Sequence, residues 1–222
     1  MREAIGQILP LAAAVAISPV PIIAVVLLLA TPRGRVNGPV FLAASLIGLG
    51  AIGAIVLILA GGLDADSADS TSSVSTVKLV LGLALVVIAI RQWRRRPHTG
   101  DVATMPRWMD AIDSFSPTKS AGAGVVLQVL NPKNLVLAIG AATAISQTGV
   151  CGRDQAIAYA VFTLIGVVGI AVPVVVFFTM GDRAGPVLAS LRTWMSLHNH
   201  AIMAVLCLVI GVKLVGDALP GF

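Results

Sequence analysis

The sequence predicts an all-α integral membrane protein with six transmembrane helices, arranged as two inverted three-helix repeats in which helices 1 and 4 are broken by proline. Three observations lead to this fold class. Hydrophobic residues make up 57% of the 222 residues and charged residues 11%, with a mean hydropathy of +0.97, whereas soluble domains carry about 25% charged residues. The chain contains six apolar runs, most of which reach the length of about 20 residues that a spanning helix needs. Two of these runs carry proline and polar residues at corresponding positions.

The six runs use up most of the chain and leave no room for a separate soluble domain. The third has Lys78 and Arg91 near its ends, where long basic side chains can reach the head groups. The first continues through Pro19 and Pro21, beyond the length of a signal-peptide core, so we expect a membrane helix and not a cleaved leader. The expected spans are approximately residues 4–30, 38–63, 77–93, 121–150, 155–181 and 201–219. They divide the chain into a first three-helix repeat (1–93), a basic linker (94–120) and a second three-helix repeat (121–222).

Basic residues gather on one side of the predicted membrane. Ten of the fifteen Lys and Arg residues flank the loops after the first, third and fifth spans, whereas the acidic segment 64–69 lies on the opposite side. The positive-inside rule therefore predicts a multi-pass protein of the plasma membrane, with both termini outside and the basic linker 94–120 in the cytoplasm. Because topology accounts for the net charge of +5, we expect no nucleic-acid partner.

A weak internal repeat links the two halves. A shift of 113 residues places Pro19 on Pro132, and a shift of 118 places the Leu-Ile-Gly of residues 46–48 on the Leu-Ile-Gly of residues 164–166. The gaps that this alignment needs fall in loops. Since each half contains an odd number of spans, the second half must enter the membrane from the opposite side. Many alternating-access transporters are built on such an inverted repeat.

The two breaks have the sequences Ser18-Pro19-Val20-Pro21 and Asn131-Pro132-Lys133-Asn134. A proline inside a helix removes one backbone donor and crowds the carbonyl four residues back. In a bilayer the freed polar groups must be satisfied by protein or by a water-filled cavity. A matched pair of breaks therefore indicates the central site of a transporter. The simpler alternative is two independent kinks that only shape helix packing.

Lys133 is the one charged residue well inside an apolar run, about 18 Å from its start at a rise of about 1.5 Å per residue, and such a lysine marks a candidate functional site. The helix that restarts beside it would add free N–H groups and a positive dipole end. We therefore expect a wet, electropositive cavity that suits a phosphate, sulfate or carboxylate. If the helix starts nearer Val125, Lys133 would instead reach the head groups. The predicted substrate-binding residues are Ser18, Pro19, Pro21, Gln128, Asn131, Pro132, Lys133 and Asn134.

The basic linker is expected to lie against the membrane surface. A juxtamembrane cluster of this kind attracts the anionic inner leaflet by about 1 kcal/mol per basic residue, and residues 107–115 could form a short interfacial helix. A plain loop that only sets topology is the alternative. The predicted membrane-surface or partner contacts are Arg94, Arg95, Arg96, Arg107 and Trp108.

Glycines are expected to be packing sites in the second and fifth spans, because small residues let membrane helices approach closely. Close packing of these two spans would build the interface between the repeats. The glycines are Gly48, Gly50 and Gly53 in the second span, and Gly166 and Gly169 in the fifth.

Other chemistries have little support in the sequence. No span carries a carboxylate away from its ends, so a proton or cation path through paired acids is not expected. His198 and His200 belong to no histidine-rich tract. Cys151 falls in a loop and Cys207 in a span, so a disulfide within the chain is not expected. Without a recognisable nucleophile–base pair or phosphate-binding glycine loop, we expect no enzyme activity, no metal and no cofactor.

Five segments carry a family resemblance: residues 18–21 (SPVP), 90–97 (IRQWRRRP), 106–109 (PRWM), 131–134 (NPKN) and 194–200 (WMSLHNH). Together they resemble the GAP family of actinobacterial membrane proteins, which includes the sulfolipid-addressing and glycopeptidolipid-addressing proteins of mycobacteria and belongs to the LysE superfamily of small exporters. The resemblance runs the whole length of the chain. The Asn-Pro-Lys-Asn segment is shared by much of the superfamily, whereas the Arg-Gln-Trp-Arg-Arg-Arg-Pro segment is more specific.

The resemblance implies a six-helix protein of the plasma membrane that helps to move a cell-envelope glycolipid outward, beside a large lipid exporter. Other members of the superfamily export basic amino acids or metal ions, or shuttle thiol electrons. This chain lacks the paired membrane cysteines of the last group and the histidine tracts of some metal exporters. The superfamily is also compatible with a homodimer, which no residue pattern demands.

Three functions follow as alternatives. The favoured one is translocation of an anionic or glycosylated membrane lipid, with its head group in the cavity and its acyl chains in the bilayer. The second is export of a small soluble solute, such as an amino acid, through the same cavity. The third is a non-transporting accessory subunit of a lipid-export or envelope-biosynthesis complex. Since no ATP-binding motif is present, the energy must come from an ion gradient, the membrane potential, a lipid gradient or a partner.

Overall fold

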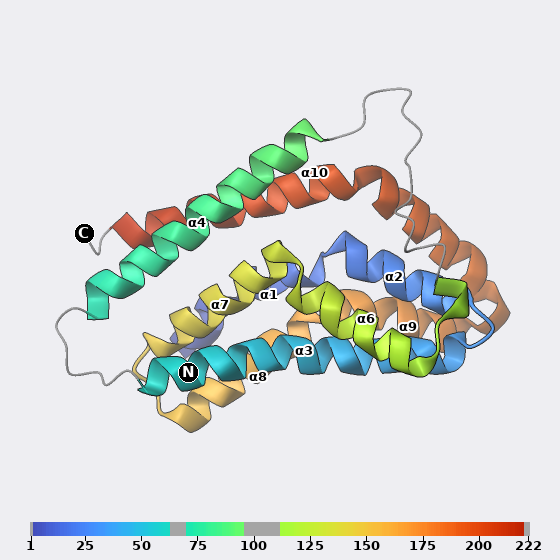
Figure 1. Cartoon of the computed structure of the whole chain (residues 1–222), viewed down its shortest axis with the longest axis horizontal. Coiled ribbons are helices and arrows are strands. Elements are labelled where there is room, and N and C mark those ends of the chain that lie inside the picture. Colours follow the sequence, from blue (N-terminus) through green and yellow to red (C-terminus); the bar gives the residue numbers. More distant parts are fainter. Residues whose placement is uncertain (1, 63–69, 96–111, 220–222) are drawn as a thin grey trace.

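The structure, a computed structural model, describes residues 2–62, 70–95 and 112–219. Within these ranges the chain is helical with short turns and contains no strand, which confirms the predicted all-α class. The helices run close to the long axis of the molecule, and both ends of the chain lie toward the same end of it (Figure 1).

The elements follow the chain in two groups. The first half contains α1 (Arg2–Ala16), α2 (Pro19–Ala30), α3 (Gly34–Gly62) and α4 (Ser70–Arg94). The second half contains α6 (Pro117–Val129), α7 (Pro132–Ser146), α8 (Gly152–Gly166), α9 (Val168–Met180) and α10 (Ala184–Ala218). Two short 3₁₀ turns, η1 (Ile112–Ser114) and η2 (Gly181–Arg183), precede α6 and α10.

Both predicted helix breaks are present. The axes of α1 and α2 are bent by 50° and those of α6 and α7 by 67°. The residue before each proline is extended, with φ −91° and ψ 108° at Ser18 and φ −72° and ψ 110° at Asn131. A proline ring disfavours the helical conformation of the residue before it and is well suited to the first position of a new helix. The sequence therefore ends one helix and starts the next at a defined residue.

Three helix boundaries extend beyond the predicted apolar spans. α4 begins at Ser70, α6 at Pro117 and α10 at Ala184, each several residues before the expected start. Apolar composition reports only the part of a helix suited to the membrane core, whereas a helix continues wherever its backbone and packing allow. In α10 the added part packs on α2, with Leu188 and Met195 two turns apart and both buried.

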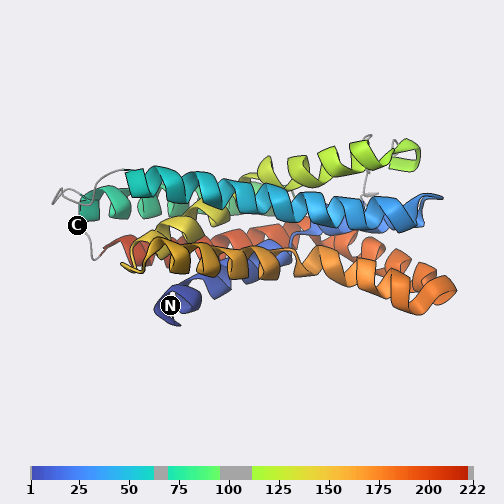
Figure 2. The ribbon, with the colours of Figure 1, turned by 90° about the horizontal axis from the view of Figure 1, so that it is seen from below.

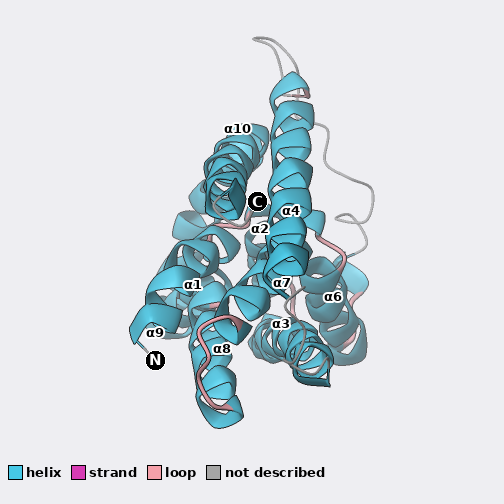
Figure 3. Ribbon diagram, turned by 90° about the vertical axis from the view of Figure 1, so that its left-hand side faces the viewer, coloured by secondary structure: helices cyan, strands magenta, loops and turns pink. Residues whose placement is uncertain are grey.

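The helices run in both directions along the long axis. In Figure 1, α1–α2, α4 and α8–α9 run from left to right, whereas α6–α7, α10 and α3 run from right to left. α4 packs mainly on α10, and these two helices form one side of the molecule (Figures 1 and 3). In the view from below, α3 runs the length of the bundle beside α8 and α9 (Figure 2).

α7, the helix that follows the second break, is enclosed by other helices. It packs against α1, α3, α4, α6 and α8, and small residues make this possible because they let neighbouring backbones approach closely. Ala138, Ala141 and Ala142 are all fully buried. The N-terminus of α7, which carries Lys133, therefore lies inside the bundle.

The apolar helices are compatible with a multi-pass membrane protein. Within the described residues, three stretches are long and apolar enough to cross a membrane, namely Gly34–Leu59, Ser75–Arg94 and Val168–Ala218, and there are up to five if each bent pair is one span. The last of these stretches contains α9, η2 and α10. It includes a turn at Gly181, whose φ of 53° is a conformation that glycine adopts without strain.

Candidate functional site

The two helix breaks meet inside the bundle. The Ser18 hydroxyl donates a hydrogen bond to Oδ1 of Asn134 over 2.8 Å, although these residues are 116 positions apart in the chain. Nδ2 of Asn134 in turn donates to Oε1 of Gln128 over 2.5 Å. Asn134 therefore joins the α1–α2 break to both helices of the α6–α7 pair. We call Ser18, Gln128, Lys133 and Asn134 the central polar cluster.

The central polar cluster is enclosed by protein. The exposed fractions are 3% for Ser18, 1% for Gln128 and 0% for Lys133 and Asn134. The sequence led us to expect a wet cavity, whereas the structure shows a closed arrangement in which the polar side chains bond one another. Buried polar groups are costly unless they are hydrogen-bonded. Ser18, Gln128 and Asn134 bond one another and Lys133 bonds to a backbone carbonyl, so that all four can lie among apolar helices.

Lys133 has a partner that the sequence analysis missed. Its Nζ donates to the backbone oxygen of Ala14 over 2.6 Å. Ala14 lies in the last turn of α1, where carbonyl groups lack helical partners and the helix dipole presents its negative end. The break that frees N–H groups for α2 also frees carbonyls at the end of α1. Lys133 is therefore buried against a helix C-terminus and does not extend to the head groups.

Backbone donors at the site are fewer than the sequence analysis expected. α2 begins with Pro-Val-Pro, so Val20 carries the only N–H among its first three residues. At α7, Oδ1 of Asn131 accepts the N–H of Lys133 over 3.1 Å. The positive character of the site therefore depends on the Lys133 ammonium group more than on the two helix N-termini.

The other predicted residues have different surroundings. Pro19 and Pro21 are buried in the first turn of α2, Asn131 is partly buried and caps α7, and Pro132 is exposed. Because Pro132 is exposed, its ring does not form part of the enclosed cluster. Its effect on the site is to set the position of the break.

A third interruption lies against the first one. α8 ends at Gly166 and α9 starts at Val168. A Cβ on Gly169 would lie 1.9 Å from the Ala16 oxygen, and a Cβ on Gly166 would lie 3.2 Å from a Val15 side-chain atom. Gly166 and Gly169, three residues apart, indicate this close approach in the sequence, where they were expected to be packing sites and not to mark a break.

Most of the predicted packing glycines hold helices together. Gly53 lies against the ring of Tyr159 in α8, where an added Cβ would overlap the ring, and Gly48 lies against Val125 in α6. The Tyr159 hydroxyl also donates to the Leu49 oxygen of α3 over 3.1 Å. The predicted packing of the second and fifth spans is thus present. The expectation for Gly50 is wrong, because a Cβ there meets no atom within 4 Å.

Part of the basic linker can be placed. Arg94 and Arg95 are exposed at the end of α4, whereas Arg96, Arg107 and Trp108 lie outside the described residues. Of the expected interfacial helix 107–115, the structure describes the end. Ile112 is buried there against α2 and its neighbours, so this part of the segment packs on protein.

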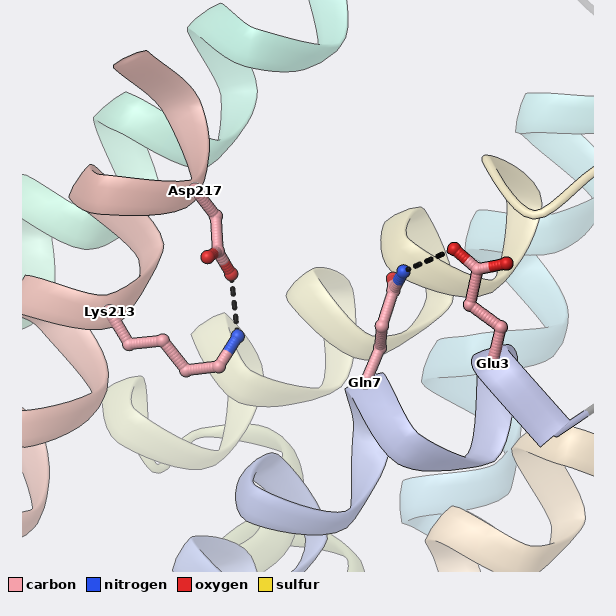
Figure 4. A network of polar contacts seen from close by, with 4 residues as sticks. All are labelled: Glu3, Gln7, Lys213 and Asp217. Carbon is pink, nitrogen blue, oxygen red and sulfur yellow. Dashed lines mark hydrogen bonds and ion pairs between the residues drawn. The ribbon is translucent and has the colours of Figure 1, made fainter. Parts of the chain in front are cut away.

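Charged groups near the chain ends pair locally. Lys213 and Asp217 of α10 form an ion pair of 2.5 Å, and Gln7 donates to Glu3 in α1 over 3.4 Å (Figure 4). All four are exposed or partly exposed. They lie near the start of α1 and near the end of α10 and are separate from the central polar cluster.

Among the described residues, no group of three or more His, Cys, Asp or Glu side chains is placed to hold a metal ion. Nδ1 of His200 lies 2.8 Å from Oε1 of Gln92 in α4, and His198 lies 2.8 Å from the Trp194 oxygen. Cys151 is exposed and Cys207 is buried, and both are free.

The bond between Ser18 and Asn134 predicts energetic coupling between the two breaks. Replacing either residue by alanine is expected to destabilise the protein by about 1–3 kcal/mol, because the remaining buried group loses a partner. The double variant should cost less than the sum of the two, by about 0.5–3 kcal/mol. Thermal or denaturant unfolding of the detergent-solubilised protein measures this cycle. Additive effects would show that the two breaks are not coupled through this bond.

One of the comparisons with known proteins identifies a family. A family model described as Sap, sulfolipid-1-addressing protein (SfLAP), matches residues 8–219, which is nearly the whole chain. Comparison with curated proteins and with solved structures found no match.

Proposed function

The chain belongs to the sulfolipid-1-addressing protein family, in agreement with the resemblance seen in its sequence, and from this premise we propose that it carries a lipid with an anionic or glycosylated head group across the plasma membrane. The observation that carries the proposal is the convergence of two broken helices on the buried Lys133. This convergence combines a charge, two helix breaks and a position inside the bundle. We propose no catalytic step and therefore no enzyme activity.

The arrangement of the halves supports six spans in two inverted repeats. Corresponding helices run in opposite directions (Figure 1), and their contacts are reciprocal. Gly48 of the first half lies against Val125 in α6, and Gly166 of the second half lies against Val15 in α1. α4 and α10 meet glycine to glycine, since a Cβ on Gly82 would lie 2.9 Å from the Gly211 oxygen, and a Cβ on Gly211 equally far from the Gly82 oxygen. Such exchange of partners is typical of two units related by a pseudo-twofold axis.

In this proposal the structure corresponds to a closed state. The Lys133 ammonium group has three donors, and one of them is held by the Ala14 oxygen. Opening would move the two breaks apart and separate Ser18 from Asn134. Lys133 would then exchange a neutral carbonyl for an anionic oxygen of the head group, and the attraction between opposite charges would be added to the hydrogen bond.

The head group and the acyl chains would take different routes. The central polar cluster offers one cation and several amide or hydroxyl groups, which suit a sulfate, a phosphate or a sugar. The description of the family names a sulfolipid, and a sulfate monoester carries the negative charge that Lys133 requires. The apolar chains would stay in the bilayer beside the helices, because no energetic gain comes from enclosing them in protein.

Charge at the two ends of the bundle supports the predicted orientation. Arg33 and Arg183 lie in the turns at the end where α2 and α9 finish, and Arg35 lies in the first turn of α3 beside them. Arg94 and Arg95 lie at the end of α4 that points the same way (Figure 1). By the positive-inside rule, we propose that this end is cytoplasmic and that both termini are outside. A large lipid exporter beside this chain and a homodimer remain proposals from the family.

Translocation by the purified protein tests the proposal. The full chain is placed in vesicles that contain lipid extracted from the native envelope, and the accessibility of the head group in each leaflet is followed by chemical labelling. We expect the anionic or glycosylated lipid to equilibrate between leaflets at least about tenfold faster than in vesicles without protein. Uptake of amino acids into the same vesicles, without lipid movement, would favour the solute exporter. Neither activity, with binding to envelope enzymes, would favour the accessory subunit.

A further inference from the structure

An open hollow of about 320 Å³ lies between α4 and α10, away from the central polar cluster. It is lined by Ala89, Ile90, Trp93 and Arg94 of α4 and by Ala204, Val205 and Leu208 of α10. We propose that this groove binds one acyl chain of an anionic phospholipid from the cytoplasmic leaflet, with the lipid phosphate on Arg94. This site goes beyond the transport proposal, and only the choice of leaflet rests on the orientation proposed above.

The groove has the shape of a trough. Ala89 and Ala204, which are 3% and 4% exposed, form its floor, whereas Ile90 and Val205, which are 48% and 53% exposed, form its walls. Its volume is at the lower end of the range of about 300–1,000 Å³ for ligand sites. A narrow apolar trough of this size suits a segment of one hydrocarbon chain better than a compact polar solute.

The end of the groove carries the groups that a phospholipid head requires. Trp93 and Arg94 lie in the last turn of α4 and both line the groove. Tryptophan is enriched where the acyl region meets the head groups, and the planar guanidinium of arginine matches the geometry of a phosphate. Arg91 and Arg95 are exposed in the same two turns, which contain no carboxylate. The charge at this end is therefore complementary to an anionic lipid.

The two helices are tied together beside this end. Oε1 of Gln92 in α4 lies 2.8 Å from Nδ1 of His200 in α10. Gln92 directly precedes Trp93, and His200 is one turn before Ala204. This bond fixes the spacing of the walls next to the head-group end, so that the groove does not depend on the lipid for its shape.

A second copy of the chain fits this face less well than a lipid. In a twofold dimer across α4 and α10, equivalent residues at one depth of the membrane face each other. Arg91, Arg94 and Arg95 of the two copies would then meet, and like charges placed together across an interface cost several kcal/mol. An anionic head group removes this conflict.

Fluorescence of Trp93 tests the site directly. In the full chain with Trp108→Phe and Trp194→Phe, Trp93 is the only tryptophan. The protein is placed in phosphatidylcholine vesicles that contain a small fraction of either brominated phosphatidylglycerol or brominated phosphatidylcholine. Bromine on an acyl chain quenches a tryptophan that it touches. We expect the anionic brominated lipid to quench Trp93 at several-fold lower mole fraction than the zwitterionic one.

Two further variants separate the head-group contact from the trough. Arg94→Gln should lower the preference for the anionic lipid by about fivefold, and Arg35→Gln, which removes an exposed arginine from the first turn of α3, should leave the preference unchanged. Val205→Phe, at an exposed wall position, should weaken quenching by both lipids because it fills the trough. Three results would overturn the proposal. The first is equal quenching of Trp93 by the two brominated lipids, and the second is a loss of anionic preference in the Arg35 variant as large as in the Arg94 variant. The third is a Trp93 that neither lipid quenches because a second copy of the chain or residues 96–111 shield it.

Discussion

Replacing Lys133 by methionine is expected to reduce lipid translocation by about ten- to a hundredfold, the factor that corresponds to losing a charged hydrogen bond of about 1.5–3 kcal/mol. The same change should leave the protein folded. Lys133 is fully buried against the Ala14 oxygen. An apolar side chain of similar length removes the cost of burying a charge, which offsets the loss of about 1–3 kcal/mol that follows when the Ala14 oxygen is left without its partner. Translocation in vesicles and thermal unfolding in detergent measure the two effects separately.

Lys213→Met is the matched control for this prediction. Lys213 lies in α10, is partly exposed and pairs with Asp217 (Figure 4), so the control removes the same charge outside the central polar cluster. We expect its translocation rate to stay close to that of the unmodified chain. If Lys133→Met transported lipid at the normal rate, the lysine would be a structural element and the central polar cluster would not be the substrate site.

Adding one methyl group at Gly169 is expected to have a large effect on stability. The Cβ of alanine would lie 1.9 Å from the Ala16 oxygen, at the point where the α8–α9 interruption meets the end of α1. The Ala16 oxygen is a backbone atom and the Cβ is fixed to the backbone of α9, so neither atom can move aside unless a helix shifts. We expect Gly169→Ala to lower the free energy of unfolding by about 1–3 kcal/mol or more, and to slow translocation because it displaces the α1–α2 break.

Gly50→Ala is the control, because its expected effect on the free energy of unfolding has the opposite sign. A Cβ at Gly50 meets no atom within 4 Å, and alanine is better than glycine inside a helix by about 0.8–1.0 kcal/mol. This variant should therefore be as stable as the unmodified chain or more stable, as measured by thermal unfolding. If Gly169→Ala were also stabilising, the close approach of α9 to α1 would not exist in the folded protein.

The helix breaks show how far local sequence can lead. Ser18 and Asn131 each precede a proline, and this local rule alone determines where one helix ends and the next begins. The lengths of α4 and α10 were less predictable, because apolar composition does not report how far a helix continues through polar residues. The role of Gly169 was also hidden, since its partner Ala16 is distant along the chain and only the packed bundle brings them together.

For the central polar cluster, too, the sequence predicted one part and the structure was needed for the other. The residue types and their positions beside the breaks indicated Ser18, Gln128, Lys133 and Asn134 as candidates. The hydrogen bonds among these side chains were not predicted. The sequence suggested instead a hydrated cavity with many free N–H groups. In the structure Ser18, Asn134 and Gln128 satisfy one another, and two prolines in the first turn of α2 leave few backbone donors.

By itself the sequence determined the all-helical class, the positions of the two proline breaks and the presence of a lone charge inside an apolar run, because these follow from composition and from the geometry of residues adjacent in the chain. Only the tertiary structure decided that the two breaks touch and that Lys133 is bound by the carbonyl end of α1. The physical reason is that hydrogen bonds between distant segments depend on how the helices are placed side by side, and no local pattern encodes that placement.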